Sequence, residues 1–228
     1  MRVSSNFLEI LKNFSSIYGS MSFKPGNVLR TINFAGTIMA EAVVEENIEK
    51  EFAIYDLNKL LALMTLNKQS CEIELEDDSI VVIGLEGTGK IKQRFTSKTL
   101  VREPPEGTVS MKNIEVDLIL TQKVINWMNT VSSILGCPNT SLVGIKGHKI
   151  SVHAMDVEGK IVDSASVVLD TVADKDFKVI FRNENLKLIP GSYRVEITSN
   201  CALFTHTERK IKYWVGIELK GSYFQQAA

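Results

Sequence analysis

The stretch of the sequence that comes nearest to a known catalytic motif is GLEGTGKI, at residues 84–91. It almost matches the phosphate-binding loop G-x-x-x-x-G-K-[ST], whose last residue reaches magnesium and whose following helix holds phosphate with its amides. Ile91 stands where the Ser or Thr is needed, and the KIKQRF segment alternates as a β-strand does. We therefore predict a glycine-rich hairpin turn. A nucleotide-dependent enzyme is the weaker alternative, which a nucleotide-binding assay would test.

The other reactive side chains are too scattered to predict a site from their spacing. The histidines and cysteines lack zinc-ligand spacing, and the sequence has no G-x-S-x-G nucleophile elbow. These residues are His148, His153, His206, Cys71, Cys137 and Cys201. Three widely separated cysteines are typical of free thiols in a reducing compartment. We expect no enzyme activity, no metal and no cofactor.

The composition is that of a globular protein without a strong net charge. Of 228 residues, 44% are hydrophobic and 23% are charged, and 26 basic residues against 27 acidic ones give a net charge of -1. Tight binding to nucleic acid or to an anionic membrane through overall charge is therefore not indicated. The first residues mix charge into their apolar run, unlike a signal peptide, and no apolar stretch approaches membrane-spanning length. We expect a cytoplasmic protein.

Two amphipathic helices with similar endings are predicted, one in each half of the chain. In the first, Asn6 is the expected N-cap and Gly19 the end, and the apolar face consists of Phe7, Ile10, Leu11 and Phe14. In the second, Thr121 is the expected cap and Gly136 the end, and the apolar face consists of Val124, Met128, Val131 and Leu135. The endings SSIYG (15–19) and SSILG (132–136) indicate an internal duplication.

The rest of the chain repeats in the same order. EFAIYDLNKLLALM (51–64) and DFKVIFRNENLKLI (176–189) each have the pattern of a strand that runs into a short helix. Three strands are predicted before each segment and three after it. They lie at 20–23, 28–33, 37–44, 71–75, 79–83 and 90–96 in the first half, and at 141–146, 149–156, 161–169, 193–198, 202–207 and 210–219 in the second.

The predicted fold class is α+β, with two tandem copies of a helix–βββ–β–helix–βββ domain. We place the copies at 1–103 and 114–228. The connector between them, at 104–113, begins with two adjacent prolines and is expected to be stiff and extended.

The outward faces of the predicted helices are polar and carry few charges. Lys12, Lys59 and Lys123 are the basic residues on or beside these faces, and Glu9 is an acid on the first of them. The plain interpretation is a solvated face. The alternative is a surface that lies against a phosphate backbone without binding it tightly.

The chain resembles the DNA sliding clamps, most closely the T-even bacteriophage type. The resemblance is carried by LEILKNF (8–14), FAIYDLN (52–58) and IKYWVGIEL (211–219), whose order and spacing match over nearly the whole chain. The first stretch is also similar to the corresponding helix of the eukaryotic clamp, the proliferating cell nuclear antigen. Two features depart from the family pattern. Asn126 and Asn129 stand where clamps often carry Arg or Lys, and the tail GSYFQQAA (221–228) has no clear equivalent.

The resemblance implies a homotrimeric ring around duplex DNA, with about twelve helices lining the hole. Such a clamp tethers the replicative DNA polymerase as a processivity factor, has no catalytic site, and is opened by an ATP-driven clamp loader. Its DNA contact would be independent of sequence. A polymerase C-terminal peptide and transcription factors would be further partners, in the host cell cytoplasm if the protein is phage-encoded. A scaffold that recruits replication or transcription partners without encircling DNA is the alternative, and it would be monomeric or dimeric.

Three sets of site residues follow from the resemblance together with the expected strands and helices. The side chains expected to face DNA are Lys12, Lys59, Lys123 and Lys187. Strands expected to pair between subunits contribute Ile91, Phe95, Val167 and Leu169. A partner-peptide pocket is expected to contain Met39, Leu100, Val101, Trp214, Val215 and Gly216. Alternation places Trp214 on the polar side of its strand, so we expect it to be partly exposed, the alternative being a core residue.

Overall fold

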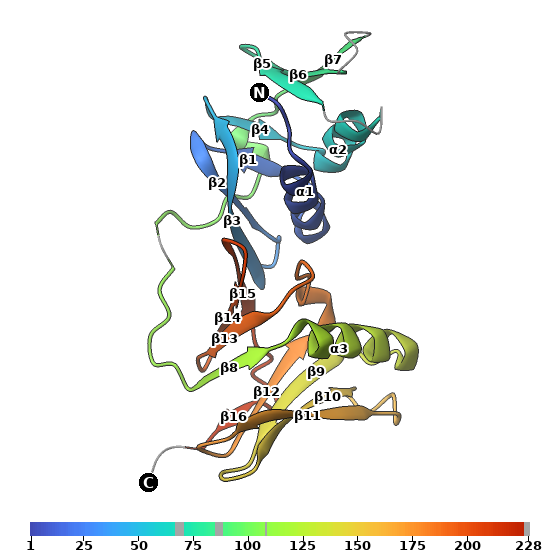
Figure 1. Ribbon diagram of the computed structural model, residues 1–228, viewed down its shortest axis with the longest axis vertical. Helices are drawn as coiled ribbons and strands as arrows, with labels where there is room; N and C mark the ends of the chain where they lie inside the picture. The colour runs from blue at the N-terminus through green and yellow to red at the C-terminus, as the bar shows by residue number, and fades with distance from the viewer. Residues whose placement is uncertain (67–70, 85–88, 108, 226–228) are drawn as a thin grey trace. The chain divides into compact units, whose positions relative to one another are not determined.

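The computed structural model describes residues 1–66, 71–84, 89–107 and 109–225. The chain folds into two compact units, Met1–Gly107 (unit 1) and Thr108–Ala228 (unit 2), and both mix helices with antiparallel strands, so the predicted α+β class is confirmed (Figure 1). The boundary between the units falls inside the segment predicted as a connector. No helix in the described part of the chain is long and apolar enough to cross a membrane.

Unit 1 packs two helices over short antiparallel ladders. Its elements are α1 (Ser5–Ile17), β1 (Met21–Phe23), β2 (Gly26–Ile32), β3 (Ile38–Ile48), β4 (Phe52–Ile54), α2 (Leu57–Thr65), β5 (Glu72–Leu75), β6 (Ser79–Ile83), β7 (Lys90–Arg94) and the 3-10 turn η1 (Lys98–Leu100). β1 pairs with β4, β2 with β3, and β5, β6 and β7 form a sheet in that order. The apolar face of α1 lies against β2, β3 and α2, which leaves its other face outward.

Unit 2 places one long helix on a larger sheet. Its elements are β8 (Val116–Leu120), α3 (Gln122–Leu135), β9 (Asn139–Gly144), β10 (Lys149–Met155), β11 (Ala165–Val172), β12 (Phe177–Arg182), the 3-10 turn η2 (Asn183–Asn185), β13 (Tyr193–Ile197), β14 (Cys201–His206), β15 (Ile211–Gly216) and β16 (Tyr223–Phe224). One sheet has the order β11-β10-β9-β12-β16, and β15, β14, β13 and β8 pair in that order. α3 contacts β9 and β10.

The duplication extends further than the sequence pattern indicated. β8, a strand that the prediction missed, comes directly before α3 and pairs with β13. The matching place before α1 holds an isolated bridge between Arg2 and Glu72, and the amide of Ile73 donates to the carbonyl of Met1 at 2.8 Å. In both units, therefore, the chain pairs with a later strand before it enters the long helix.

The helix ends follow the cap rules, with one correction. Ser4, not Asn6, is the N-cap of α1, and its hydroxyl accepts a hydrogen bond from the amide of Phe7 at 3.1 Å. The prediction of Asn6 is wrong because that residue already lies in the first turn. Thr121 caps α3 as predicted, and Gly136 ends it in the left-handed conformation, with φ at 69°.

The second half departs from the predicted repeat. After β12 the chain makes only the single turn η2, so the prediction of a second α-helix in this half is wrong. In unit 1 the Asp56 side chain caps α2 by accepting from the amide of Lys59 at 2.9 Å. η2 has no side-chain cap, and Pro190 with Gly191 follows a few residues later.

The buried face of α3 also differs from the prediction. It consists of Ile125, Met128 and Ser132, while Val124 and Val131 are only half-buried. The predicted face was therefore rotated by about one residue, although Met128 belongs to both.

The cap of α1 provides a test of the local structure. Ser4→Ala removes the acceptor for the Phe7 amide and is expected to lower the free energy of unfolding by about 1 kcal/mol. Ser5→Ala removes an exposed hydroxyl one residue later and is the control, with a change below about 0.5 kcal/mol. Urea denaturation of both variants measures the difference. Equal effects would contradict the assignment of the cap.

Candidate functional site

The lysines predicted to face DNA do not all occupy equivalent positions. Lys12 and Lys123 are exposed on α1 and α3, and Lys59 is exposed in the first turn of α2. Lys187 lies on the irregular segment after η2 and is half-buried, because the helix predicted there does not form.

The outward faces of the helices are nearly neutral. Each of the three α-helices among the described residues contains a single basic residue, and Glu9 of α1 is the one acid in their sequences. The remaining exposed residues of α3 are mostly uncharged, namely Gln122, Asn126, Asn129, Thr130, Ser133 and Ile134. Such surfaces can touch phosphates at isolated points but cannot bind them strongly.

β7 stands at the end of its sheet, as predicted for the strand at 90–96. The amide of Phe95 donates to the carbonyl of Asp78 at 2.8 Å. Hydrogen-bonded and non-bonded positions alternate along an antiparallel ladder, so the amides of Lys90, Lys92 and Arg94 point away from β6. These amides are available to a further strand.

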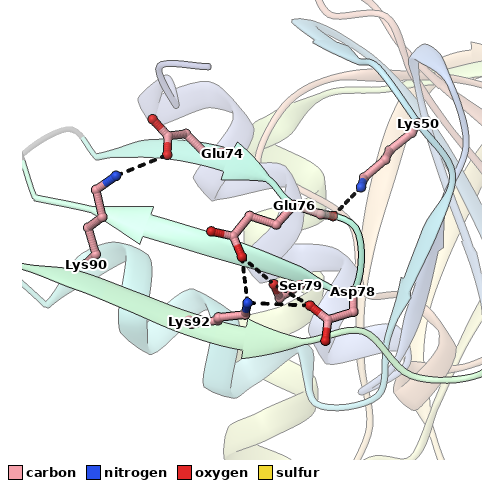
Figure 2. A network of polar contacts seen from close by, with 7 residues as sticks. All are labelled: Lys50, Glu74, Glu76, Asp78, Ser79, Lys90 and Lys92. Atoms are coloured by element: carbon pink, nitrogen blue, oxygen red, sulfur yellow. Dashed lines mark hydrogen bonds and ion pairs between the residues drawn. The ribbon is translucent and has the colours of Figure 1, made fainter.

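A network of charged side chains lies over the outer face of this sheet (Figure 2). Lys92 Nζ is 2.6 Å from Glu76 Oε2 and 3.5 Å from Asp78 Oδ1, and Lys90 lies 3.4 Å from Glu74. The hydrogen bond from Lys92 holds the pKa of Glu76 below its usual value. Exposed ion pairs contribute little stability, so the main consequence is a fixed arrangement of charge beside the β7 edge.

Phe95 is part of the packing of unit 1 as well as a neighbour of the β7 edge. Its ring is stacked 4.8 Å from that of Phe52, which is stacked 4.6 Å from Phe23. Lys50 Nζ lies 5.5 Å from the centroid of the Phe95 ring. A substitution of Phe95 would therefore disturb unit 1 whether or not the residue also contacts another subunit.

β11 stands at the end of the five-stranded sheet of unit 2. Leu169 is buried and Val167 is half-buried on the face towards α3, and Val168 is 61% exposed on the opposite face. The edge position of both predicted strands is thus confirmed. Their pairing between subunits stays a prediction.

The residues predicted for a partner-peptide pocket belong partly to each unit. In unit 1, Met39 and Val101 are buried and Leu100 is 61% exposed. In unit 2, Val215 is buried and Gly216 is half-buried. The expectation that Trp214 is partly exposed is wrong, since 6% of it is accessible. Simple alternation fails here because consecutive residues of β15 are buried.

The connector does not leave unit 1 directly. Lys24 Nζ lies 3.3 Å from Glu103 Oε2, and Arg30 donates to the carbonyls of Pro105 at 2.9 Å and Gly107 at 3.2 Å. The first part of the predicted connector is therefore fixed on β1 and β2, ahead of the unit boundary.

Sequence reasoning missed an exposed aromatic residue beside this anchored segment. Phe34, at the tip of the β2–β3 hairpin, is 75% exposed, and the guanidinium of Arg102 lies 5.8 Å from its ring centroid. A phenylalanine inside a predicted turn, next to Ala35 and Gly36, was the available signal, because large apolar residues are uncommon in turns.

The near-match to a phosphate-binding loop is a hairpin in the part that the structure describes. The amide of Gly84 donates to Gly89 at 3.4 Å, and the strand β7 follows in place of a helix. Residues 85–88 lie outside the described residues. Within the described ranges, no three His, Cys, Asp or Glu side chains gather as metal ligands would.

Comparisons of sequence agree over most of the chain. Residues 4–90 match the family model described as DNA polymerase processivity factor. The chain is similar to the sliding clamp of Vibrio phage KVP40, with 26% identity over 201 residues that cover 86% of this chain and 90% of the relative. It is 27% identical over 204 residues to the sliding clamp of Enterobacteria phage T4, covering 86% of both.

Solved structures share the fold. Proliferating cellular nuclear antigen from Entamoeba histolytica matches with a TM-score of 0.70 over 93% of this chain and 94% of that chain, at 11% identity. The same antigen from A. fulgidus, bound to the C-terminal region of FEN-1, matches with a TM-score of 0.68 over 96% of both chains, at 12% identity. The duplicated α+β architecture is therefore that of these clamps.

The packing of Phe95 leads to a stability prediction. Phe95→Ala removes a half-buried ring from the stack with Phe52 and is expected to lower the free energy of unfolding by roughly 2 kcal/mol, below the range for fully buried aromatics. Ile91→Ala, on the same strand and also half-buried, should cost less because it leaves the aromatic stack intact. Thermal unfolding of the two variants compares them. A decrease in stability confined to Ile91→Ala would contradict this role for Phe95.

Proposed function

We infer that this chain is a sliding clamp, a non-enzymatic processivity factor of DNA replication of the kind found in T4-like phages. The observation that carries the inference is the agreement of two independent likenesses over nearly the whole chain. Phage sliding clamps match its sequence over 86% of its length, and a nuclear antigen clamp matches its duplicated fold over 93%. Because the relatives are phage proteins, we propose that it works in the cytoplasm of an infected host cell.

We propose that the protein retains DNA by enclosing it and contacts it only weakly. Three α-helices with a single basic residue each offer few phosphate contacts, so binding would be weak, independent of sequence and compatible with sliding. We propose that Lys12, Lys59, Lys123 and Lys187 make these contacts. A ring holds DNA by enclosing it and does not need high affinity, which fits a net charge of -1.

The proposed assembly is a homotrimeric ring closed by head-to-tail contacts. The open edge of β7, with Ile91 and Phe95, would pair with β11, with Val167 and Leu169, of the next copy. The outward amides of β7 support this arrangement, because exposed strand edges otherwise promote uncontrolled pairing. A non-encircling scaffold is the alternative, and a monomeric or dimeric native mass would favour it.

The proposed partners are a polymerase C-terminal peptide, an ATP-driven clamp loader and transcription factors. The A. fulgidus clamp bound to the C-terminal region of FEN-1 is a precedent for peptide docking on this fold. We propose that the contact residues for such peptides come from Met39, Leu100, Val101, Trp214, Val215 and Gly216. Exchange between partners requires weak binding, with a Kd on the order of micromolar, about -8 kcal/mol.

Lys12→Ala tests the proposed DNA contact. We expect processivity of the polymerase on a primed circular template to fall equally on templates of different sequence. The slope of log affinity against log salt should decrease by about 0.9 for each phosphate that is no longer neutralised. Lys112→Ala removes an exposed lysine outside the helices and is the control. A sequence-specific footprint, or tight binding to linear DNA at physiological salt, would argue against the inference.

Lys92→Pro tests the proposed subunit contact. Proline removes an amide that points away from β6, so the ladder within unit 1 should survive while pairing with another copy is prevented. Lys92→Ala removes the same ion pairs but keeps the amide, and it should remain trimeric. Sedimentation of both variants measures their mass. A trimeric Lys92→Pro variant would exclude this edge as the contact.

A further inference from the structure

The tip of the β2–β3 hairpin is held rigidly. Asn33 Oδ1 accepts hydrogen bonds from the amides of Thr37 at 2.8 Å and Ile38 at 3.2 Å, and Asn33 Nδ2 donates to Thr37 Oγ1 at 2.8 Å. Arg102 Nη1 donates to the carbonyl of Phe34. The backbone that carries the exposed ring of Phe34 is therefore held in place before any ligand arrives, which reduces the entropy cost of binding.

Gly36 allows Arg102 to approach the hairpin closely. Its φ is +73°, and a Cβ at this position would lie 3.3 Å from Arg102 Nη2. A larger residue would have to adopt a strained backbone and would crowd the guanidinium. The turn is thus built to bring a cation against the exposed aromatic ring.

Among the described residues, Arg102 has no acidic partner, unlike three other arginines. Arg30 lies 3.2 Å from Glu41, Arg182 lies 2.7 Å from Glu218, and a third, Arg194, is likewise paired with a carboxylate. In the described part of the chain, Arg102 donates a hydrogen bond to the carbonyl of Phe34, lies against its ring and approaches Gly36. Most of its five donors, in a fixed planar fork, remain available for a carboxylate.

We propose that Phe34 and Arg102 form a recognition point for partner peptides that carry a carboxylate next to a large apolar side chain. The proposal rests on the inferred clamp function and specifies which peptides it recruits. The carboxylate would bind the free edge of the Arg102 guanidinium, and the apolar side chain would lie against the Phe34 ring. Aromatic and arginine side chains are the types that dominate binding energy at such surfaces. Leu100, at the end of η1 and two residues before Arg102, is also exposed and adds apolar surface.

A panel of synthetic peptides tests this with the full-length protein. Each is a fluorescein-labelled six-residue peptide with Leu-Phe among serines. One form has Asp before the Leu and a blocked end, one has Asn in its place, and one has no Asp but ends in a free carboxylate after the Phe. Fluorescence anisotropy measures affinity. We expect a carboxylate-bearing form to bind about tenfold more tightly than the Asn form, as a charge-assisted hydrogen bond would provide.

The three forms also separate the two sources of the carboxylate. A preference for the Asp form identifies an acidic side chain, and a preference for the free end identifies a chain terminus. Equal binding of all three forms to the wild-type protein would overturn the proposal.

Variants separate recognition from a structural role of Arg102. Arg102→Gln should abolish the tenfold preference while leaving the Asn form unchanged, and Phe34→Ala should weaken all forms. Lys210→Gln, which removes an exposed cation from unit 2, should leave the preference intact. If Arg102 only holds the hairpin, Arg102→Gln would lower the melting temperature and weaken every form equally, and the proposal would fail.

The same preparations distinguish this proposal from the inferred function. A wild-type protein that assembles into trimers and stimulates its polymerase, but shows no carboxylate preference, refutes the recognition point alone. A wild-type protein that neither assembles nor stimulates a polymerase refutes the clamp inference itself.

Discussion

The backbone N–H and C=O groups of an edge strand need hydrogen-bond partners, and this requirement determines which sheet edges of each unit are covered. In the sheet of unit 1, the bridge between Arg2 and Glu72 covers the β5 side, and in the large sheet of unit 2 the short strand β16 covers the β12 side. The ring centroid of Phe224 in β16 lies 6.4 Å from that of Phe177 in β12, and this stacking helps to hold β16 against the sheet. The opposite ends, β7 and β11, have no such cover within the described residues. In these two sheets the edges left without a partner are therefore β7 and β11, and the two edges differ from each other.

Charge is distributed just as unevenly between the elements. Lysines and acids are arranged as pairs over the β5–β7 sheet, where Lys92 links Glu76 and Asp78. The three α-helices carry almost none of this charge. A near-neutral protein can therefore present a weakly basic helical surface without an excess of lysine elsewhere. The helices are held by their buried apolar faces and carry isolated cations on their exposed polar faces, so each cation can act separately from its neighbours.

Local sequence patterns correctly predicted the elements that are determined by neighbouring residues in the chain. The strand at 79–83 was predicted with its observed bounds, and Thr121 and Gly136 end α3 as their chemistry requires. The failures come from tertiary contacts. Trp214 follows the alternation of a two-faced strand but is buried, because consecutive positions of β15 are covered. β8 is short and follows a proline-rich segment, so its partner β13, more than 70 residues away, determines it.

The sequence predicted those candidate site residues whose position follows from a single strand or helix. It did not predict those that depend on a contact between distant parts of the chain. An edge strand can be recognised from its place at the end of a repeat, and an exposed lysine from its place on a helix. The contact of Phe34 with Arg102 joins a hairpin tip to a residue 68 positions later, just before the connector, and no periodic pattern in the sequence predicts that contact. The missing helix after β12 is a similar case, since Asn183 bonds to Cys137 and Thr140 in place of starting a helix.

The difference between the two open edges has a geometric consequence. β7 is a short strand lined by lysine and arginine, and β11 is a longer strand whose outer face carries Val168 and Asp170. Joining unlike edges gives every copy the same orientation, so a closed assembly would have two distinguishable sides and a sense of rotation. A partner bound to one side would then always face the same way along a threaded duplex. Polarity of this kind would let a machine that moves in one direction be attached without any reading of the DNA sequence.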